Sequence, residues 1–302
     1  MMRRSAEQGV ALVIVLWSVM LLTVIAGNFV FAMRTENSVV RNAISVAQAE
    51  AAANGAVHRA LYETFKPAAD GKVWKADGRQ RQWQQDGATI KVVMMDVSGK
   101  IDINTSADAL LKGLLLSVGV DETKATQLLD AILDWRDVDT LPRPHGAESE
   151  AYRAAGLKYE PANAPFEAVE QLQQVLGMTK DIYSRIAPLV TVQSRQPGIN
   201  PLVAPRGVLM AIPDVSAAQV DAYLEQRQQS LDSGETPLPF PAAAAFMSAA
   251  SGAMIDVRAE ARLPDGAVFV RQAIARRTGD AKRPLAFLLW KEGRSEPAAP
   301  AP

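Results

Sequence analysis

The stretch VALVIVLWSVMLLTVIAGNFVFAM, residues 10–33, decides the fold of this 302-residue chain. It contains no charged residue, and at about 1.5 Å of helical rise per residue it spans about 36 Å, enough to cross the hydrocarbon core of a bilayer. Arg3 and Arg4 precede it, and basic residues before a span favour a cytoplasmic amino terminus. From Arg34 to about Thr64 the chain stays free of Pro but becomes polar. We therefore expect one long helix that begins in lipid and emerges from it.

A cleaved signal peptide and a plain membrane anchor are two interpretations of this segment. A signal peptide has an apolar core of about 7 to 15 residues, so this run is too long for one, whereas a plain anchor fits its length. The leader MMRRSAEQG ends in Gly9 directly before the apolar run, which resembles the cleavage site of type IV prepilins and pseudopilins. The resemblance implies that prepilin peptidase cuts after Gly9 and that the new terminus, Val10, is N-methylated.

Position 14 departs from the usual pattern of these families. They usually carry Glu at the fifth mature position, where it neutralises the terminal ammonium of a neighbouring subunit. If the mature chain begins at Val10, its fifth residue is Ile14. A minor pseudopilin of type II secretion systems, protein K, shows the same departure, so Ile14 favours that family over an ordinary filament subunit.

Composition indicates a folded protein without a strong electrostatic preference. Hydrophobic residues make up 48% of the chain and charged residues 22%, and the formal net charge is −1. A global attraction to nucleic acid or to an anionic membrane surface is therefore not expected. The chain has no Cys, which excludes disulfides, thiolate nucleophiles and Cys-ligated metals.

Strand patterns lie on both sides of a long helical region. Residues 66–86 are rich in Gly and polar residues and indicate a loop with one short strand around Trp83. Further on, alternating or β-branched segments bounded by turn residues predict strands, and the alternation is typical of an antiparallel sheet with one face covered by a helix. These segments are Thr89–Val97, Met254–Leu263, Ala267–Arg276 and Pro284–Trp290.

Between these strands the pattern predicts helices, and it contains a weak internal repeat. Ile-Asp-Ile-Asn-Thr at 101–105 is echoed by Gly-Ile-Asn-Pro at 198–201, and a Leu-rich or Val-rich helix, a turn and another helix follow each copy. Such pairs resemble SAM-like or helix-hairpin-helix modules. The predicted helices of the first part run from Ser106 or Asp108 to Leu116, from Asp121 to Trp135, from Pro165 to Leu176 and from Asp181 to Val192.

The order GKIDINTS, AILDWRDVD and HGAESEAY within residues 99–152 resembles protein K of type II secretion systems. The resemblance extends from Gly9 to about Trp290. It implies an α+β, type IV pilin-like fold, in which a long amino-terminal transmembrane helix packs on a small antiparallel sheet and a large all-helical SAM-like domain is inserted between strands. It also implies a minor pseudopilin at the tip of the pseudopilus that helps to initiate its assembly, with minor pseudopilins I and J as partners and the major pseudopilin reached through them.

The same resemblance predicts location and domain organisation. The chain is expected to cross the inner membrane once and to place its carboxy-terminal part in the periplasm. The expected parts are a prepilin leader at 1–9, the transmembrane helix at 10–33, the periplasmic helix and first sheet part at 34–99, the inserted helical domain at 100–252, the final strands at 253–292 and a tail without fixed structure at 293–302.

Five carboxylates form the strongest candidate for a binding site. They are Asp134, Asp137, Asp139, Glu148 and Glu150. Asp134 and Asp137 are three residues apart, so on a helix they share a face, and the following loop can bring further oxygens near them. Calcium takes 6 to 8 oxygen ligands, whereas the alternative is a solvated acidic helix end partnered by Arg136 and Arg143. The resemblance to protein K implies structural calcium in the helical domain.

Two other functions were weighed against this one. A membrane-anchored DNA receptor of competence type also carries helix-hairpin-helix modules, but residues 100–160 hold 7 Lys and Arg against 11 Asp and Glu, whereas phosphate binding needs the opposite sign. An enzyme would need a nucleophile or a base with an orienting partner. The two His, His58 and His145, lie in no catalytic motif, so neither nucleic acid binding nor catalysis is expected.

Overall fold

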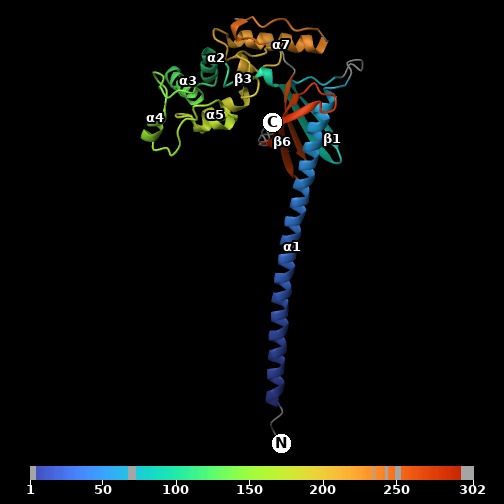
Figure 1. Ribbon diagram of the computed structural model, residues 1–302. Helices are drawn as coiled ribbons and strands as arrows, with labels where there is room; N and C mark the ends of the chain where they lie inside the picture. Colours follow the sequence, from blue (N-terminus) through green and yellow to red (C-terminus); the bar gives the residue numbers. More distant parts are fainter. Residues whose placement is uncertain (1–4, 67–72, 234, 242–243, 249–252, 294–302) are drawn as a thin grey trace.

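A single helix of 59 residues, α1 (Ser5–Glu63), projects from the rest of the protein as a rod (Figure 1). The computed structural model describes residues 5–66, 73–233, 235–241, 244–248 and 253–293. The first four residues of the predicted leader, with Arg3 and Arg4, and the predicted tail from position 294 lie outside the described residues. The expected long helix is confirmed, and it ends one residue before Thr64.

The first half of α1 is apolar and exposed. Every side chain from Ala11 to Arg34 is exposed, and among the described residues this is the one helix long and apolar enough to cross a membrane. Its polar groups are satisfied within the helix, because the Ser18 and Thr23 hydroxyls each donate to the carbonyl four residues earlier, at 2.8 Å. Such internal pairing is what a helix needs in lipid, where no water can replace the missing bonds.

The second half of α1 packs on a five-stranded antiparallel sheet in the order β1-β2-β5-β6-β7. Alternation sends one side of each central strand toward the helix, so Val92 and Val257 are fully buried there. The helix contributes small residues, including Ala49, Ala53 and Ala60, which allow close approach. The strands are β1 (Asp77–Gln85), β2 (Ala88–Asp96), β5 (Met254–Arg262), β6 (Val268–Arg277) and β7 (Leu285–Glu292).

Four of the five strands agree with the sequence-based prediction to within two residues at each end, and β1 differs in length. The predicted strand around Trp83 is present, but it is longer than the short strand expected, because nine residues form β1. The residues Gln80, Gln82, Gln84 and Gln85 are exposed on this edge strand, and they give no apolar alternation to detect. Pairing with β2 holds the strand in place, with Trp83 opposite Ile90.

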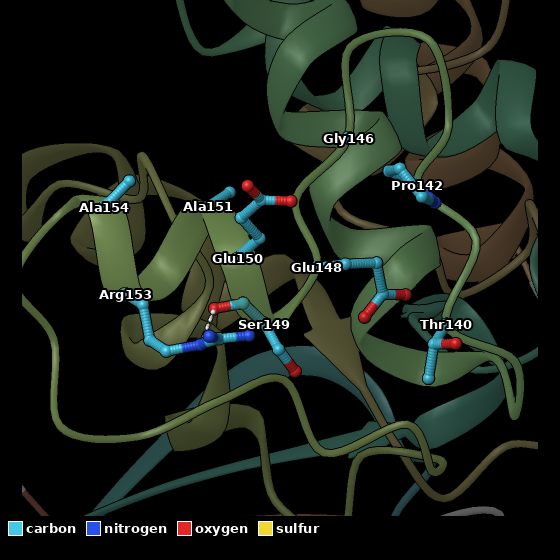
Figure 2. A pocket seen from close by; sticks show the side chains of 9 residues that line it. All are labelled: Thr140, Pro142, Gly146, Glu148, Ser149, Glu150, Ala151, Arg153 and Ala154. Atoms are coloured by element: carbon cyan, nitrogen blue, oxygen red, sulfur yellow. Dashed lines mark hydrogen bonds between the residues drawn. The ribbon is translucent and has the colours of Figure 1, made fainter.

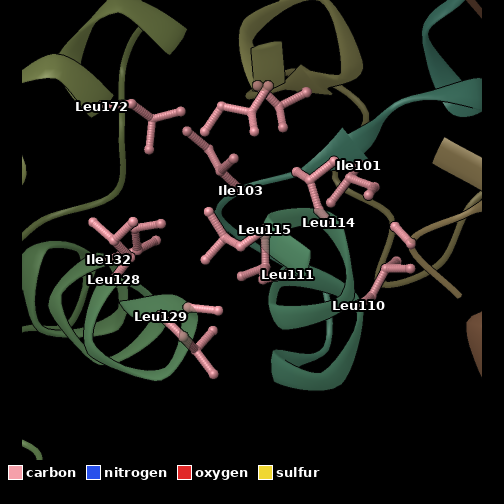
Figure 3. Close-up of a cluster of buried hydrophobic side chains, with 14 of the residues drawn as sticks. Ile101, Ile103, Leu110, Leu111, Leu114, Leu115, Leu128, Leu129, Ile132 and Leu172 are labelled. Atoms are coloured by element: carbon pink, nitrogen blue, oxygen red, sulfur yellow. The ribbon is translucent and has the colours of Figure 1, made fainter. Parts of the chain in front are cut away.

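The helical domain lies between β2 and β5 in the sequence and has its own apolar core (Figure 3). Leu114 and Leu115 of α2 and Leu128 and Ile132 of α3 belong to this one buried cluster. A short parallel pair, β3 with β4, joins the start of the domain to its middle. The elements are β3 (Ile101–Asp102), α2 (Asp108–Ser117), α3 (Glu122–Arg136), α4 (Ser149–Ala154), α5 (Lys180–Ile186), β4 (Val190–Thr191), α6 (Arg206–Leu209) and α7 (Ala217–Ser233).

Two predicted helices of this domain are shorter than expected. Over residues 165–176 only a 3₁₀ segment forms, Val169–Gln174, because the Asn104 side chain binds the backbone N–H and C=O of Phe166, at 2.8 and 2.9 Å, in place of helical partners. The helix predicted from Asp181 to Val192 stops at Ile186, ahead of Pro188. Both differences arise from contacts that join distant parts of the chain or from a Pro that cannot continue the helix.

Polar contacts connect the helical domain to the sheet, whose apolar core is separate. The Lys100 ammonium lies 2.7 Å from the Asp256 carboxylate on β5, and both side chains are largely buried. The backbone N–H of Asn200 donates to the backbone carbonyl of Ser98 at 2.8 Å. Next to it Gly99 packs so closely on Val203 that a Cβ there would lie 2.9 Å from backbone atoms. These contacts fix the domain beside the sheet at the carboxy-terminal end of α1 (Figure 1).

Candidate functional site

Gly9 and Val10, the residues of the predicted cleavage site, lie inside the first turns of α1. The helix continues through the bond between them without interruption. Glycine in a helix costs about 1 kcal/mol relative to alanine, so Gly9 weakens the helix locally. Cleavage between Gly9 and Val10 stays a prediction.

The carboxylate region is built around Asp134, in the last turn of α3. Its side chain is fully buried and accepts hydrogen bonds from the backbone N–H of Ala147, at 2.8 Å, and of Arg143, at 3.3 Å. Gly146 approaches so closely that a Cβ on it would lie 1.9 Å from an Asp134 oxygen. Asp134 thus holds the loop before α4 against α3, and the HGA part of the motif is explained by this contact.

Asp137 lies next to Asp134 but not on the helix. The sequence-based prediction that both share a helix face was wrong, because α3 ends at Arg136 and Asp137 has extended dihedrals, φ −81° and ψ 169°. As a result the chain turns and Asp139 accepts from the Leu141 amide at 2.9 Å within the following loop. The turn, rather than helical spacing, brings the carboxylates of this region together.

Glu148 is the residue directly before α4, and it faces the turn that follows α3. Its side chain is 7% exposed, and neither of its carboxylate oxygens has a hydrogen-bond partner. It lines a pocket of about 460 Å³ together with Thr140, Pro142 and Gly146 (Figure 2). One oxygen of Asp137 and the side-chain oxygen of Asn163 are also buried without a partner.

The charges of this region act on one another. The pKa of the Glu148 carboxyl is raised by burial first and then by the charges of Asp134, Asp137 and Asp139, and the Asn163 amide works against this rise. Burial also raises the pKa of Asp137, with Asp139 adding to it, and that of Asp134, with Asp137 adding to it. Four carboxylates therefore repel one another in a partly dehydrated place, an arrangement that a bound cation relieves.

Glu150 stands apart from these four. It is exposed on α4, and although it lines the same pocket, its carboxylate and that of Glu148 turn to different sides (Figure 2). The side-chain oxygen of Asn163 was not predicted from the sequence, because the loop of Asn163 approaches α3 only in the folded chain. Asn163 has φ +44°, which Asn tolerates better than most residues.

The oxygens that bear on calcium binding are those buried in this region without a hydrogen-bond partner. Within the part of the chain that the structure describes, no group of three or more His, Asp or Glu is arranged to hold a metal ion. Two carboxylates and one amide nevertheless present unpaired buried oxygens, from Asp137, Glu148 and Asn163. Hard cations bind such oxygens and take further ligands from backbone carbonyls or water. These oxygens are of the chemical kind that calcium prefers, and Asp134 is occupied in holding the loop, so calcium binding here stays a prediction.

The first helical hairpin does not offer a phosphate site. Gly119, with φ +84°, makes the turn between α2 and α3, and its N–H donates to Leu116 at 2.9 Å. The next N–H, of Val120, donates to Leu115 at 3.1 Å, and the Arg185 guanidinium donates to the Val118 carbonyl. Hairpins that bind DNA present these amides to phosphate, whereas here the chain uses them internally.

Comparisons with known proteins point in one direction. A family model described as type II secretion system (T2SS), protein K, matches residues 91–195. Protein K of Pectobacterium carotovorum subsp. carotovorum is 27% identical over 262 residues, which cover 74% of this chain and 76% of that protein. Protein K of Pseudomonas aeruginosa is 24% identical over 245 residues, covering 74% and 73%.

A solved structure shares the fold. It is the crystal structure of the GspK-GspI-GspJ complex from the type 2 secretion system of enterotoxigenic Escherichia coli, and the match covers 87% of this chain and 99% of the other. The TM-score is 0.56 at 18% identity. The match supports the α+β fold, with a helix packed on an antiparallel sheet and a separate helical domain, and the DNA-receptor alternative finds no support among these relatives.

Proposed function

We propose that this chain, which belongs to the protein K family of type II secretion systems and is a minor pseudopilin, caps the tip of the pseudopilus and helps to initiate its assembly. The observation that carries the proposal is the position of the helical domain. This domain lies beside the sheet at the end of α1 away from the amino terminus, and α7 runs across its far side (Figure 1). A subunit stacked above would meet it, whereas subunits below and beside α1 would not.

Ile14 supports the same position. An ammonium at Val10, among apolar helices, is costly unless it is paired, and the usual partner in these filaments is a Glu five residues into a neighbouring mature subunit. A subunit with Ile14 can receive such a charge partner from the subunit below it. It offers none to a subunit above, so growth beyond it is disfavoured.

The partners we propose are the minor pseudopilins I and J, and through them the major pseudopilin. The E. coli relative of similar fold was crystallised as a complex of GspK, GspI and GspJ. Prepilin peptidase is the proposed processing enzyme, cutting between Gly9 and Val10 and leaving an N-methylated Val10. The apolar half of α1 then anchors the chain once in the inner membrane, with the sheet and the helical domain in the periplasm.

Calcium is the proposed structural ion of the helical domain. The support is the set of unpaired buried oxygens on Asp137, Glu148 and Asn163, with Asp139 near them. Asp134 positions the loop, and exposed Glu150 is the weakest of the five predicted ligands. When bound, the ion supplies positive charge that links α3 to the loop before α4.

Crosslinking in membranes tests the tip proposal. With minor and major pseudopilins co-expressed, the parent chain is expected to crosslink only to subunits below and beside it at the end of the filament. Ile14→Glu is expected to allow crosslinks to subunits stacked above it as well. Ile14→Leu is the matched control, because it keeps the apolar side chain. Copies of the parent chain spaced along the filament shaft would contradict the tip position.

A further inference from the structure

β7, the last strand, is an open sheet edge with an apolar surface. Among the described residues it pairs with β6 alone, so its other edge carries backbone groups that no strand satisfies. Four of its eight residues are exposed, and three of these are Phe287, Leu288 and Trp290. Long apolar edges are a liability in isolated proteins and are normally covered or blunted.

The opposite edge of the same sheet provides an internal comparison. The exposed residues of β1 are four glutamines, and Arg79 and Arg81 lie between or beside them. That edge carries the polar side chains with which proteins protect an edge from association. The two edges therefore differ in chemistry, and it is the β7 edge whose surface fits a protein partner.

Aromatic residues extend the surface of β7 onto α1. His58 contacts the rings of Phe287 and Trp290 at centroid distances of 5.6 and 5.4 Å. Tyr62 follows one helical turn later and is 65% exposed, and Phe65 lies just past the helix end. We call these five residues the α1–β7 seam. Beneath it Arg271 is fixed by Glu50 at 2.6 Å and Asn54 at 2.7 Å, so the seam rests on an ordered support.

The charge beside the seam is positive. The β6–β7 turn and its flanks carry Arg276, Arg277, Lys282 and Arg283, all exposed, against the single acid Asp280. The Arg277 guanidinium lies over the Phe65 ring, 4.8 Å from its centroid, which joins the basic turn to the seam. A surface that fits here is apolar in its middle and acidic at its membrane-distal end.

The distance from the membrane excludes lipid as the cover. The predicted span ends at Met33, and 25 residues of helix separate it from His58, about 38 Å at 1.5 Å per residue. No acyl chain or headgroup reaches that height. Subunits anchored in the same membrane by parallel helices do place their folded parts at this height beside α1.

We infer that the α1–β7 seam, with the basic β6–β7 turn at its end, is the docking surface for an adjoining minor pseudopilin, which contacts it through an apolar strip ended by acidic side chains. This inference rests on the proposed function. It adds the side of the molecule on which that partner lies and the chemistry of the partner's surface.

The test places a photo-crosslinking amino acid in the full-length chain, in membranes that also contain the minor pseudopilins I and J. The positions are Tyr62 and Phe287 in the seam and Gln84 on β1 as the control at the other edge. Adducts with I or J are expected from the two seam positions and not from Gln84. Lys282→Glu together with Arg283→Glu is expected to reduce the seam adducts about tenfold, because like charges then face each other.

The outcomes separate this inference from the proposed function. If I and J co-purify with the chain but crosslink only from Gln84, or equally from all three positions, the seam is not the docking surface although the function stands. Adducts between two copies of this chain from the seam also overturn the inference. If neither I nor J co-purifies with the parent chain, the proposed function fails as well.

Discussion

Replacement of Glu148 by Gln should remove most of the stabilisation that calcium gives to the protein. The change keeps the size of the side chain and removes a buried negative charge that Asp134, Asp137 and Asp139 repel. A chain from Arg34 onward suits the measurement, because the fully buried positions of α1 begin at Ala49 and all of them are retained. In chelator the variant should melt at or slightly above the parent, and in calcium it should melt below it.

The unpaired oxygens give calcium something to stabilise. Four buried oxygen atoms, both of Glu148 and one each of Asp137 and Asn163, have no partner, and each such group costs about 1–3 kcal/mol. A cation that binds only the folded state stabilises it by about 2.7 kcal/mol at a hundredfold excess over Kd. For a protein of this size each kcal/mol raises the melting temperature by about 2–4 °C, so calcium should raise that of the parent by about 5–11 °C.

Calorimetry of the parent, Glu148→Gln and Glu150→Gln, each in calcium and in chelator, checks this. Glu150→Gln is the matched control, because Glu150 lies two residues away and lines the same pocket but is exposed. It should keep the full calcium response, whereas Glu148→Gln should keep less than about a third of it. Equal melting of the parent in calcium and chelator would refute the metal site and favour solvated carboxylates.

Three further predictions concern pH, packing and processing. Because the folded-state pKa values of Asp134 and Glu148 are raised above 3.8 and 4.5, the metal-free protein should lose stability as pH rises through the raised values, and Glu148→Gln should flatten this loss in a melting series. Gly146→Ala should destabilise by about 1–3 kcal/mol in chemical unfolding, because its Cβ would meet Asp134, whereas Gly55→Ala, with nothing within 4 Å, should stabilise slightly; equal effects would contradict the close contact. Mass spectrometry of the membrane protein should find Val10 as a methylated terminus, with Gly9→Ala slowing cleavage less than Gly9→Leu, and recovery of an intact amino terminus in cells with active prepilin peptidase would contradict this.

The sequence predicted the fold where each residue's pattern depends on its near neighbours. The apolar segment 10–33 and the strict alternation of apolar and polar residues in β5 are local patterns, so the long helix and the central strands could be placed, although Asp256 and Glu260 on the polar side of β5 are buried as well. The full length of β1 was not predicted, because an edge strand with exposed glutamines has no alternating apolar face. The helix expected over 165–176 was wrong, because the side chain of Asn104, more than 60 residues away, binds the backbone N–H and C=O of Phe166.

The candidate site likewise has parts that local sequence predicts and parts that depend on the tertiary structure. The carboxylates were found as a cluster in the sequence, but the prediction placed Asp137 on a helix that ends at Arg136. The need for Gly at 146 and the part played by Asn163 arise from loops that meet α3 only in the folded chain. Residue type and spacing therefore predicted a group of neighbouring carboxylates, whereas the tertiary structure was needed to tell which of their oxygens are buried without a partner.

The two apolar cores assign separate tasks to the two parts of the molecule. The carboxylates lie in the helical domain, whereas the seam is built on α1 and β7, which belong to the sheet. The parts meet through polar contacts such as Lys100 with Asp256 and Lys291 with Glu170, which are weaker and more local than a shared core. The proposed calcium ion would therefore stabilise the helical domain without altering the proposed docking surface on α1 and β7. A tip subunit needs this separation, because its cap must resist growth above while its lower side remains open to the subunits beneath it.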